Sequence, residues 1–140
     1  CTGALVCGAA GLLKGVRSTT HWASFHLLPY FGAIPVDRRV VVDGKHVSAA
    51  GVTAGIDGAL TLAALLRDDL AAQQIQLGLE YAPEPPFDSG TPKTAPAEVL
   101  AAAREEIREL TAQRLATAIR IGRELGVDVE RIGTAVAEAP

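Results

Sequence analysis

The residue with the clearest potential for chemistry is Cys1, which leads through Thr2 and Gly3 into an apolar run ending at Leu13. Because the run is apolar on every side, it predicts a helix buried between layers over residues 4–13. A cysteine at the start of a helix lies near free backbone N–H groups and the positive end of the helix dipole. Both lower a thiol pKa from its free value of about 8.5 and favour the nucleophilic thiolate. The same N–H groups can hold a developing anion. The pattern is typical of a catalytic cysteine, with an inert buried cysteine as the alternative.

Two further side chains are candidates for the same site. Thr2 brings a hydroxyl and a backbone N–H beside the sulfur, or else caps the helix. His21 follows a strand predicted over residues 17–20, and sites in open α/β sheets lie at the carboxyl ends of strands. The alternative for His21 is an ordinary residue at a helix start, and Cys7 is interpreted as a small buried residue. The three His and two Cys have no metal-ligand spacing, so we expect no metal site.

The composition excludes several classes of protein. An apolar content of 49%, with 21% charged residues, is that of a soluble globular protein. The net charge of −3 gives no attraction to nucleic acid or to an anionic membrane. No apolar run reaches the roughly 18 residues that span a bilayer. We therefore expect neither a nucleic-acid nor a membrane partner. The two cysteines are too close along one short helix to pair easily, which fits a reducing, cytoplasmic location.

The predicted elements alternate between strands and helices, which indicates an α/β fold with parallel pairing and one antiparallel hairpin. The signals are turn residues, helix caps and apolar spacing. In chain order we predict a strand over 17–20, a helix over 22–30, a hairpin over 38–48 turning at Asp43-Gly44, a helix capped by Thr53 and running to 66, a helix over 68–79, a proline-rich extended segment over 82–96, one long helix over 97–125, and a short helix capped by Asp128.

We divide the chain into residues 1–125, the C-terminal portion of a single domain, and residues 126–140, a C-terminal tail or short docking helix. An elbow between a strand and a helix needs a strand before it, and the sequence contains no methionine. We therefore expect these residues to be the later part of a longer protein. A helix-turn-helix over residues 119–137 is disfavoured, because its second helix carries a single basic residue.

Four motifs, in the same order, resemble those of the ThiJ/PfpI superfamily. They are residues 1–6 with 9–13, Thr19-Thr20-His21-Trp22, residues 51–57, and residues 76–87, the last similar to the isocyanide hydratase branch. The resemblance covers about residues 1–100. It implies a flavodoxin-like three-layer α/β sandwich, of which this chain is the part from the nucleophile elbow onward. Thr2 stands where protease-like members place a histidine, which agrees with the hydratase branch.

The resemblance implies a hydro-lyase in which Cys1 is the nucleophile and Thr2 lies beside it. Gly3, His21 and Val52 are then pocket or supporting residues, and the substrate is a small apolar isocyanide. The thiolate adds to the isocyanide carbon, and water converts the resulting thioimidate to an N-substituted formamide without a metal or other cofactor. The general acid and base, an Asp in isocyanide hydratases, lies outside this chain, so the isolated chain is expected to be inactive. The resemblance also implies a homodimer, with residues 82–96 and the long helix at its interface.

One alternative belongs to a different class of protein. A similar domain with a Cys-Thr-Gly elbow is the sensor half of AraC-type transcription regulators, where it binds a ligand and need not catalyse. The regulators carry a separate DNA-binding domain after it, which these 140 residues do not contain. Redox sensing is a third interpretation, because an exposed thiol of low pKa oxidises readily.

Overall fold

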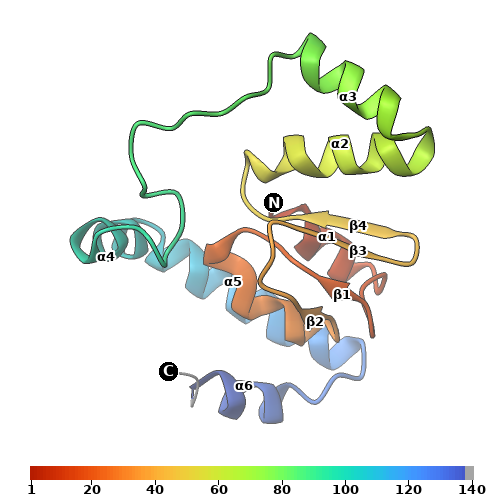
Figure 1. The fold of residues 1–140 in the computed structure, drawn as a ribbon. Helices are drawn as coiled ribbons and strands as arrows, with labels where there is room; N and C mark the ends of the chain where they lie inside the picture. Colours follow the sequence, from red (N-terminus) through yellow and green to blue (C-terminus); the bar gives the residue numbers. More distant parts are fainter. Residues whose placement is uncertain (138–140) are drawn as a thin grey trace.

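Two short sheets lie at the centre of the computed structural model, which describes residues 1–137 (Figure 1). β1 and β2 pair in parallel, and β3 and β4 form an antiparallel hairpin. The elements in chain order are α1 (Gly3–Ala9), β1 (Arg17–Ser18), the 3-10 helix η1 (Trp22–Phe31), β2 (Ile34–Pro35), β3 (Val40–Asp43), β4 (His46–Ala49), α2 (Ala54–Leu66), α3 (Asp69–Gly78), α4 (Ala97–Glu106), α5 (Arg108–Glu124) and α6 (Val129–Ala137). The parallel pair and the flanking helices confirm the α/β class.

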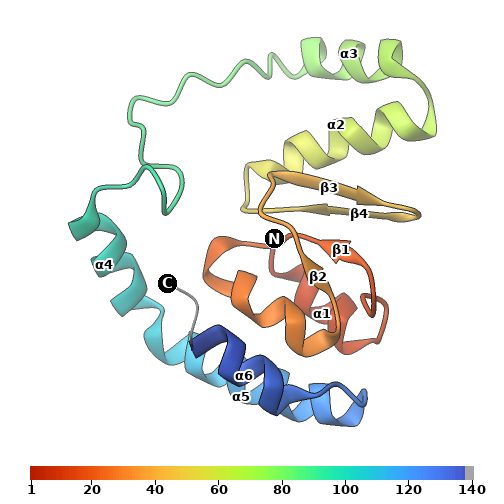
Figure 2. The same ribbon diagram turned by 60° about the horizontal axis from the view of Figure 1, so that its bottom comes forward.

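The core lies on one side of the sheets, where η1 packs against α5 and α6. Leu27, Tyr30 and Phe31 of η1 are buried together with Ala118 of α5 and Val129 of α6. Figure 2 shows α6 running alongside α5. The backbones come close at Gly122 of α5, where an added Cβ would lie 2.6 Å from the Tyr30 carbonyl oxygen. Residues 138–140 of the predicted tail lie outside the described residues.

On the other side, α2 covers the hairpin and α3 packs along α2 (Figure 1). Ala54 of α2 is fully buried, and Gly58 lies so close to Ala49 of β4 that an added Cβ would be 3.0 Å from the alanine methyl. The predicted bounds of both helices are confirmed. α3 begins as expected, since the Asp68 carboxylate accepts a hydrogen bond from the Ala71 N–H at 2.8 Å.

The hairpin forms as predicted, but its turn is one residue further along. Asp43 still pairs with His46, so the two turn residues are Gly44 and Lys45. Gly44 has a φ of 58°, which is the positive φ that a type II′ turn needs at its first central position. Asp43 remains in the strand, where its carboxylate accepts a hydrogen bond from the Arg17 N–H at 2.8 Å.

The long helix predicted over residues 97–125 is wrong in one respect, because the chain breaks it at Ile107 into α4 and α5 (Figure 2). Ile107 has φ −98° and ψ 3°, outside the helical region, and neither Pro nor Gly signals the break. α5 buries Ala118 and Gly122 against η1 and α6, whereas α4 buries no residue. The helix therefore breaks at the point where the chain passes from the exposed α4 to α5, which packs against η1 and α6.

α1 is shorter and more exposed than the predicted buried helix over residues 4–13. Its packing surface is Gly8, which lies against Phe31, while Val6 is 72% exposed and Cys7 is exposed as well. Apolar composition alone predicted burial on all sides, but in the described structure α1 packs chiefly on η1 and α5. The interpretation of Cys7 as a buried residue is therefore wrong.

Residues 82–96 form the expected irregular segment, which lies apart from the sheets (Figure 1). Lys93 pairs with Asp37, in the loop between β2 and β3. Within residues 1–137, no helix combines the length and the apolar character that crossing a membrane requires.

We predict that Gly122→Ala destabilises the fold by about 2 kcal/mol, because the new methyl overpacks the contact with Tyr30 and Val129. Gly55→Ala in α2 is the matched control, since an added Cβ there meets no atom within 4 Å. Helix propensity alone makes that change neutral or stabilising by up to about 1 kcal/mol. Urea unfolding of both variants measures the difference, and equal stabilities would contradict the packing described here.

Candidate active site

Two hydrogen bonds hold the backbone of Cys1 between the ends of two strands. Its amino nitrogen donates to the carbonyl oxygen of Ala49, the last residue of β4, at 3.0 Å. Its own carbonyl oxygen accepts from the Thr20 hydroxyl, two residues beyond β1, at 2.9 Å. Thr20 is buried and Cys1 is exposed, so this contact is partly buried. Cys1 therefore lies at the carboxyl ends of β1 and β4, the edge where α/β proteins place their sites.

A pocket of about 270 Å³ opens beside Cys1. Gly3 and Cys7 of α1 line one side of the pocket. His46 and Val47 of β4 line the other side. Leu12 adds an apolar wall. Cys7 and His46 were not predicted as site residues. The spacing of Cys7 from Cys1 was visible in the sequence, but the position of His46 depends on how the hairpin folds onto α1.

Thr2 occupies the N-cap position of α1, yet its side chain makes no capping hydrogen bond. Its backbone has helical angles, with φ −65° and ψ −5°, and its carbonyl oxygen accepts from the Leu5 N–H at 3.0 Å. Capping is therefore not the role of this hydroxyl in the structure. It remains next to Cys1 in sequence, half-buried.

His21 lies close to Cys1 and also begins η1. Its Nδ1 accepts a hydrogen bond from the Ala23 N–H at 3.3 Å, so it acts as the helix-start residue that was the alternative expectation. Burial lowers the pKa of His21, and the positive charge of Arg114 lowers it further. The imidazole is thus neutral at pH 7, with Nδ1 as acceptor and Nε2 left to carry the proton.

Val52 and Trp22 do not line the Cys1 pocket. Val52 is 80% exposed at the turn before α2. Its neighbour Gly51 lies against His21, where an added Cβ would be 3.5 Å from the ring. Trp22 faces a separate pocket between η1 and the α4–α5 bend. Of the predicted supporting residues, Gly3 lines the Cys1 pocket, whereas His21 follows Thr20 without lining the pocket and Val52 lies at the surface.

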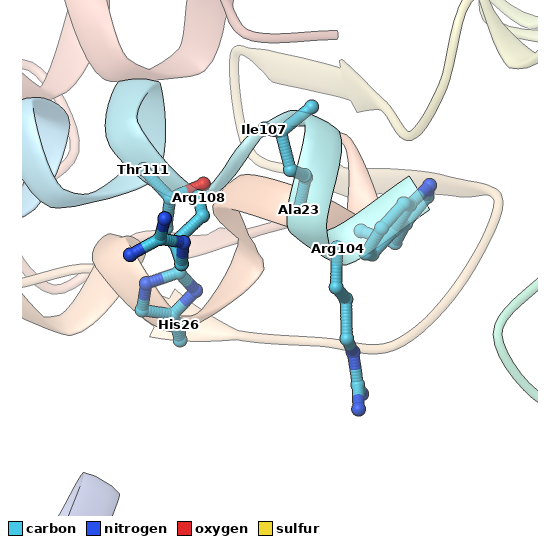
Figure 3. Close-up of a pocket in the computed structure, with 7 residues that line it drawn as sticks. Ala23, His26, Arg104, Ile107, Arg108 and Thr111 are labelled. Atoms are coloured by element: carbon cyan, nitrogen blue, oxygen red, sulfur yellow. The ribbon is translucent and has the colours of Figure 1, made fainter. Parts of the chain in front are cut away.

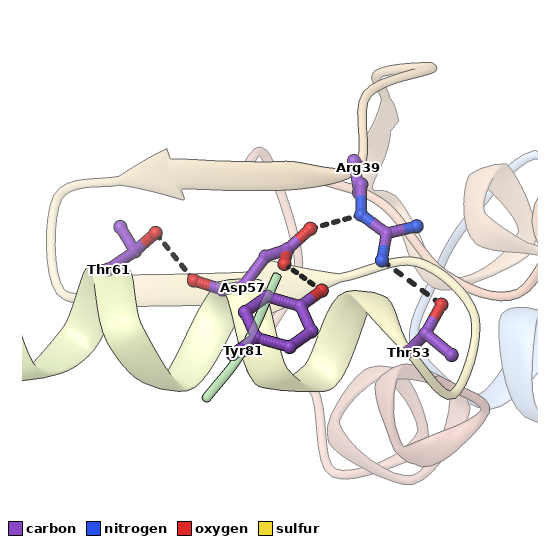
Figure 4. Close-up of polar contacts among 5 residues, drawn as sticks. All are labelled: Arg39, Thr53, Asp57, Thr61 and Tyr81. Carbon is purple, nitrogen blue, oxygen red and sulfur yellow. Dashed lines mark hydrogen bonds and ion pairs between the residues drawn. The ribbon is translucent and has the colours of Figure 1, made fainter. Parts of the chain in front are cut away.

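A polar network fixes the start of α2, which follows directly from the strand that holds Cys1 (Figure 4). Arg39 pairs with Asp57 and donates to the Thr53 hydroxyl at 3.0 Å, while the Tyr81 hydroxyl donates to Asp57 at 2.6 Å. Thr53 is at the N-cap position as predicted, but its side chain does not cap the helix, because its hydroxyl oxygen accepts from Arg39.

This network also sets the protonation of Asp57. Burial alone raises the pKa of the carboxyl, but the hydrogen bonds from Tyr81 and Arg39 outweigh burial and lower the pKa overall. The carboxylate is therefore charged at neutral pH.

Within residues 1–137, no group of three or more His, Cys, Asp or Glu side chains is arranged to hold a metal ion.

The fold and the pocket define an α/β protein with a cysteine at the carboxyl ends of its strands. Residues 1–65 match the model of the DJ-1/PfpI family. Over 105 residues the chain is 62% identical to the isonitrile hydratase of Pseudomonas putida, a match that covers 75% of this chain and 46% of that protein. The crystal structure of a ThiJ/PfpI family protein from Pseudomonas syringae superimposes with a TM-score of 0.82 at 49% identity, covering 84% of this chain and 49% of that one.

Residues 1–65 belong to the DJ-1/PfpI family, as the motifs indicated, and the expected flavodoxin-like α/β fold is confirmed. The chain spans about half the length of these two relatives.

We predict that Tyr81→Phe lowers the free energy of unfolding by about 1 kcal/mol at pH 7, because it removes a hydrogen bond to the charged Asp57. A lowered carboxyl pKa stabilises the fold above the unfolded-state pKa and ceases to do so as pH falls through the folded-state value. The difference between the variant and the parent should therefore shrink below about pH 4. Unfolding in urea between pH 3 and 7 measures it.

Asp57→Asn supplies the control for this prediction. In that background Tyr81→Phe should have little remaining pH dependence, since the titrating group is gone. A loss that is independent of pH in the parent background would show that Tyr81 acts by packing alone.

Proposed function

We propose that Cys1 is the nucleophile of a cysteine-dependent hydration of isocyanides to N-substituted formamides. The observation that carries this proposal is the 62% identity to an isonitrile hydratase in a chain whose Cys1 borders a pocket. The Cys1 side chain is exposed and stands beside the first turn of α1. Backbone N–H groups there favour the thiolate.

In the proposed reaction the Cys1 sulfur bonds to the terminal carbon of R–N≡C, and a proton is delivered to the same carbon. The product is a thioimidate, R–N=CH–S, on the enzyme. Water then adds to that carbon, the carbon–sulfur bond breaks, and R–NH–CHO leaves as the thiol is restored. The sequence consumes one isocyanide and one water and needs no change of oxidation state from a cofactor.

The residues that line the pocket, and those next to Cys1 in the structure, have separate roles in this proposal. Ala4, Leu12 and Val47 supply apolar contact for the R group. Thr2 and Gly3 support the turn that presents the sulfur, and the neutral His21 supports it from the start of η1. No Asp or Glu is among the residues that line the pocket. We therefore assign the general acid and base to the part of the relatives that this chain does not match, so that the chain alone is inactive.

We also propose that the working enzyme is a cytoplasmic homodimer. The extended segment over residues 82–96 and the α4–α5 pair offer the surface for it. Phe87 is 78% exposed, and Val99 and Leu110 are each close to half exposed. Apolar side chains of this kind are the ones that association covers.

The test measures formamide production from an aryl isocyanide by two proteins: this chain alone, and this chain joined to the unmatched part of the Pseudomonas putida relative. We expect turnover by the joined protein and none by the chain alone. Cys1→Ala should reduce turnover to the uncatalysed rate. Cys7→Ala, which changes the second exposed cysteine of the same pocket, should leave it largely intact.

Full turnover in the Cys1→Ala variant would contradict the proposal. A folded joined protein with no turnover would contradict it as well and would favour ligand or redox sensing at Cys1.

A further inference from the structure

A second pocket, of about 320 Å³, lies between η1 and the bend that joins α4 to α5 (Figure 3). Trp22 and His26 line it from η1, and Arg104, Ile107 and Arg108 line it from the bend. It shares no lining residue with the Cys1 pocket. Its volume falls in the range of small-molecule sites, which begins at about 300 Å³. The proposed hydration uses none of these residues.

The charges around this pocket are positive. Arg104 and Arg108 both line the pocket, one on each side of the break at Ile107, and both side chains are exposed. Arg108 is partly compensated by Glu105, at 3.1 Å. Among the described residues no acidic side chain pairs with Arg104, and none of the lining residues is acidic. An anion placed here would give Arg104 a partner of opposite charge.

The rest of the lining is apolar or neutral. Trp22 presents an indole ring, and Ala23 and Ile107 add aliphatic surface. Burial lowers the pKa of His26, so its imidazole is neutral at pH 7 and can donate or accept a hydrogen bond. Figure 3 shows Arg108 reaching toward His26 while Arg104 extends outward beside the pocket. A planar apolar wall with guanidinium groups at its rim matches a flat, aromatic anion.

We propose that this pocket binds a small aromatic carboxylate, with its ring against Trp22 and Ile107 and its carboxylate at Arg104 and Arg108. A carboxylate fits the planar fork of a guanidinium, and the ring gains contact with the indole. The proposal does not depend on the activity of Cys1, because the two pockets are separate.

Trp22 makes the test direct, because it is the single tryptophan of the chain and lines the pocket. Phenylacetate is titrated into the chain while tryptophan fluorescence is recorded, beside 2-phenylethanol, 2-phenylethylammonium and acetate. We expect a saturable change with phenylacetate alone. The dissociation constant should rise with added salt, because the Arg side chains are exposed.

Arg104→Gln and Arg108→Gln should each weaken phenylacetate binding about three- to tenfold, the loss expected for a partly screened charged hydrogen bond. Arg67→Gln is the matched control, because Arg67 is an exposed arginine at the end of α2 that does not line the pocket. It should leave the affinity unchanged. An equal response to 2-phenylethanol, unchanged affinity in both pocket variants, or no saturable change with phenylacetate would each overturn the proposal.

Discussion

The structure depends on the two hydrogen bonds that hold the Cys1 backbone between Ala49 and Thr20. They join three parts of the chain that are otherwise far apart in sequence: the start of α1, the end of β1 and the end of β4. Because Thr20 is buried, loss of the Cys1 partner would leave its hydroxyl without a hydrogen bond, which destabilises the fold. The position of the cysteine is therefore set by the sheet ends rather than by α1 itself.

What surrounds this point is held in place by close packing on one side and by polar contacts on the other. Below the sheets, Gly8 and Gly122 let α1 and α5 approach η1 to distances that no other residue type allows. Above them, α2 meets the hairpin through small residues, and the Arg39–Asp57–Tyr81 network keeps its first turn in place. The segment from Ala49 to Thr53, which passes His21, is thus fixed at both ends. A cysteine pocket between two anchored layers suits chemistry that requires a constant geometry.

Much of the fold could be predicted from local signals, and its errors have physical causes. The Asp68 cap and the apolar spacing of residues 54–66 placed α2 and α3 correctly, because caps and periodicity act over a few residues. The hairpin turn moved by one residue because Asp43 bonds to Arg17, a contact 26 residues away in sequence. The break at Ile107 has no local signal, and the exposure of α1 depends on which elements pack against it. The same division between local signals and tertiary contacts holds for the candidate site. Gly3 lines the Cys1 pocket and His21 starts η1, both positions that local sequence indicates, whereas His46 and the Asp57 network depend on tertiary contacts.

The central claim is that Cys1, and not Cys7, which is also exposed, is the activated thiol. Timed alkylation of the folded chain with iodoacetamide at pH 7, with each cysteine quantified by peptide mass spectrometry, tests it most directly. The helix start beside Cys1 should make it react about ten times faster than Cys7, which lies toward the end of the same helix. Equal rates at the two cysteines, or faster reaction at Cys7, would contradict the account.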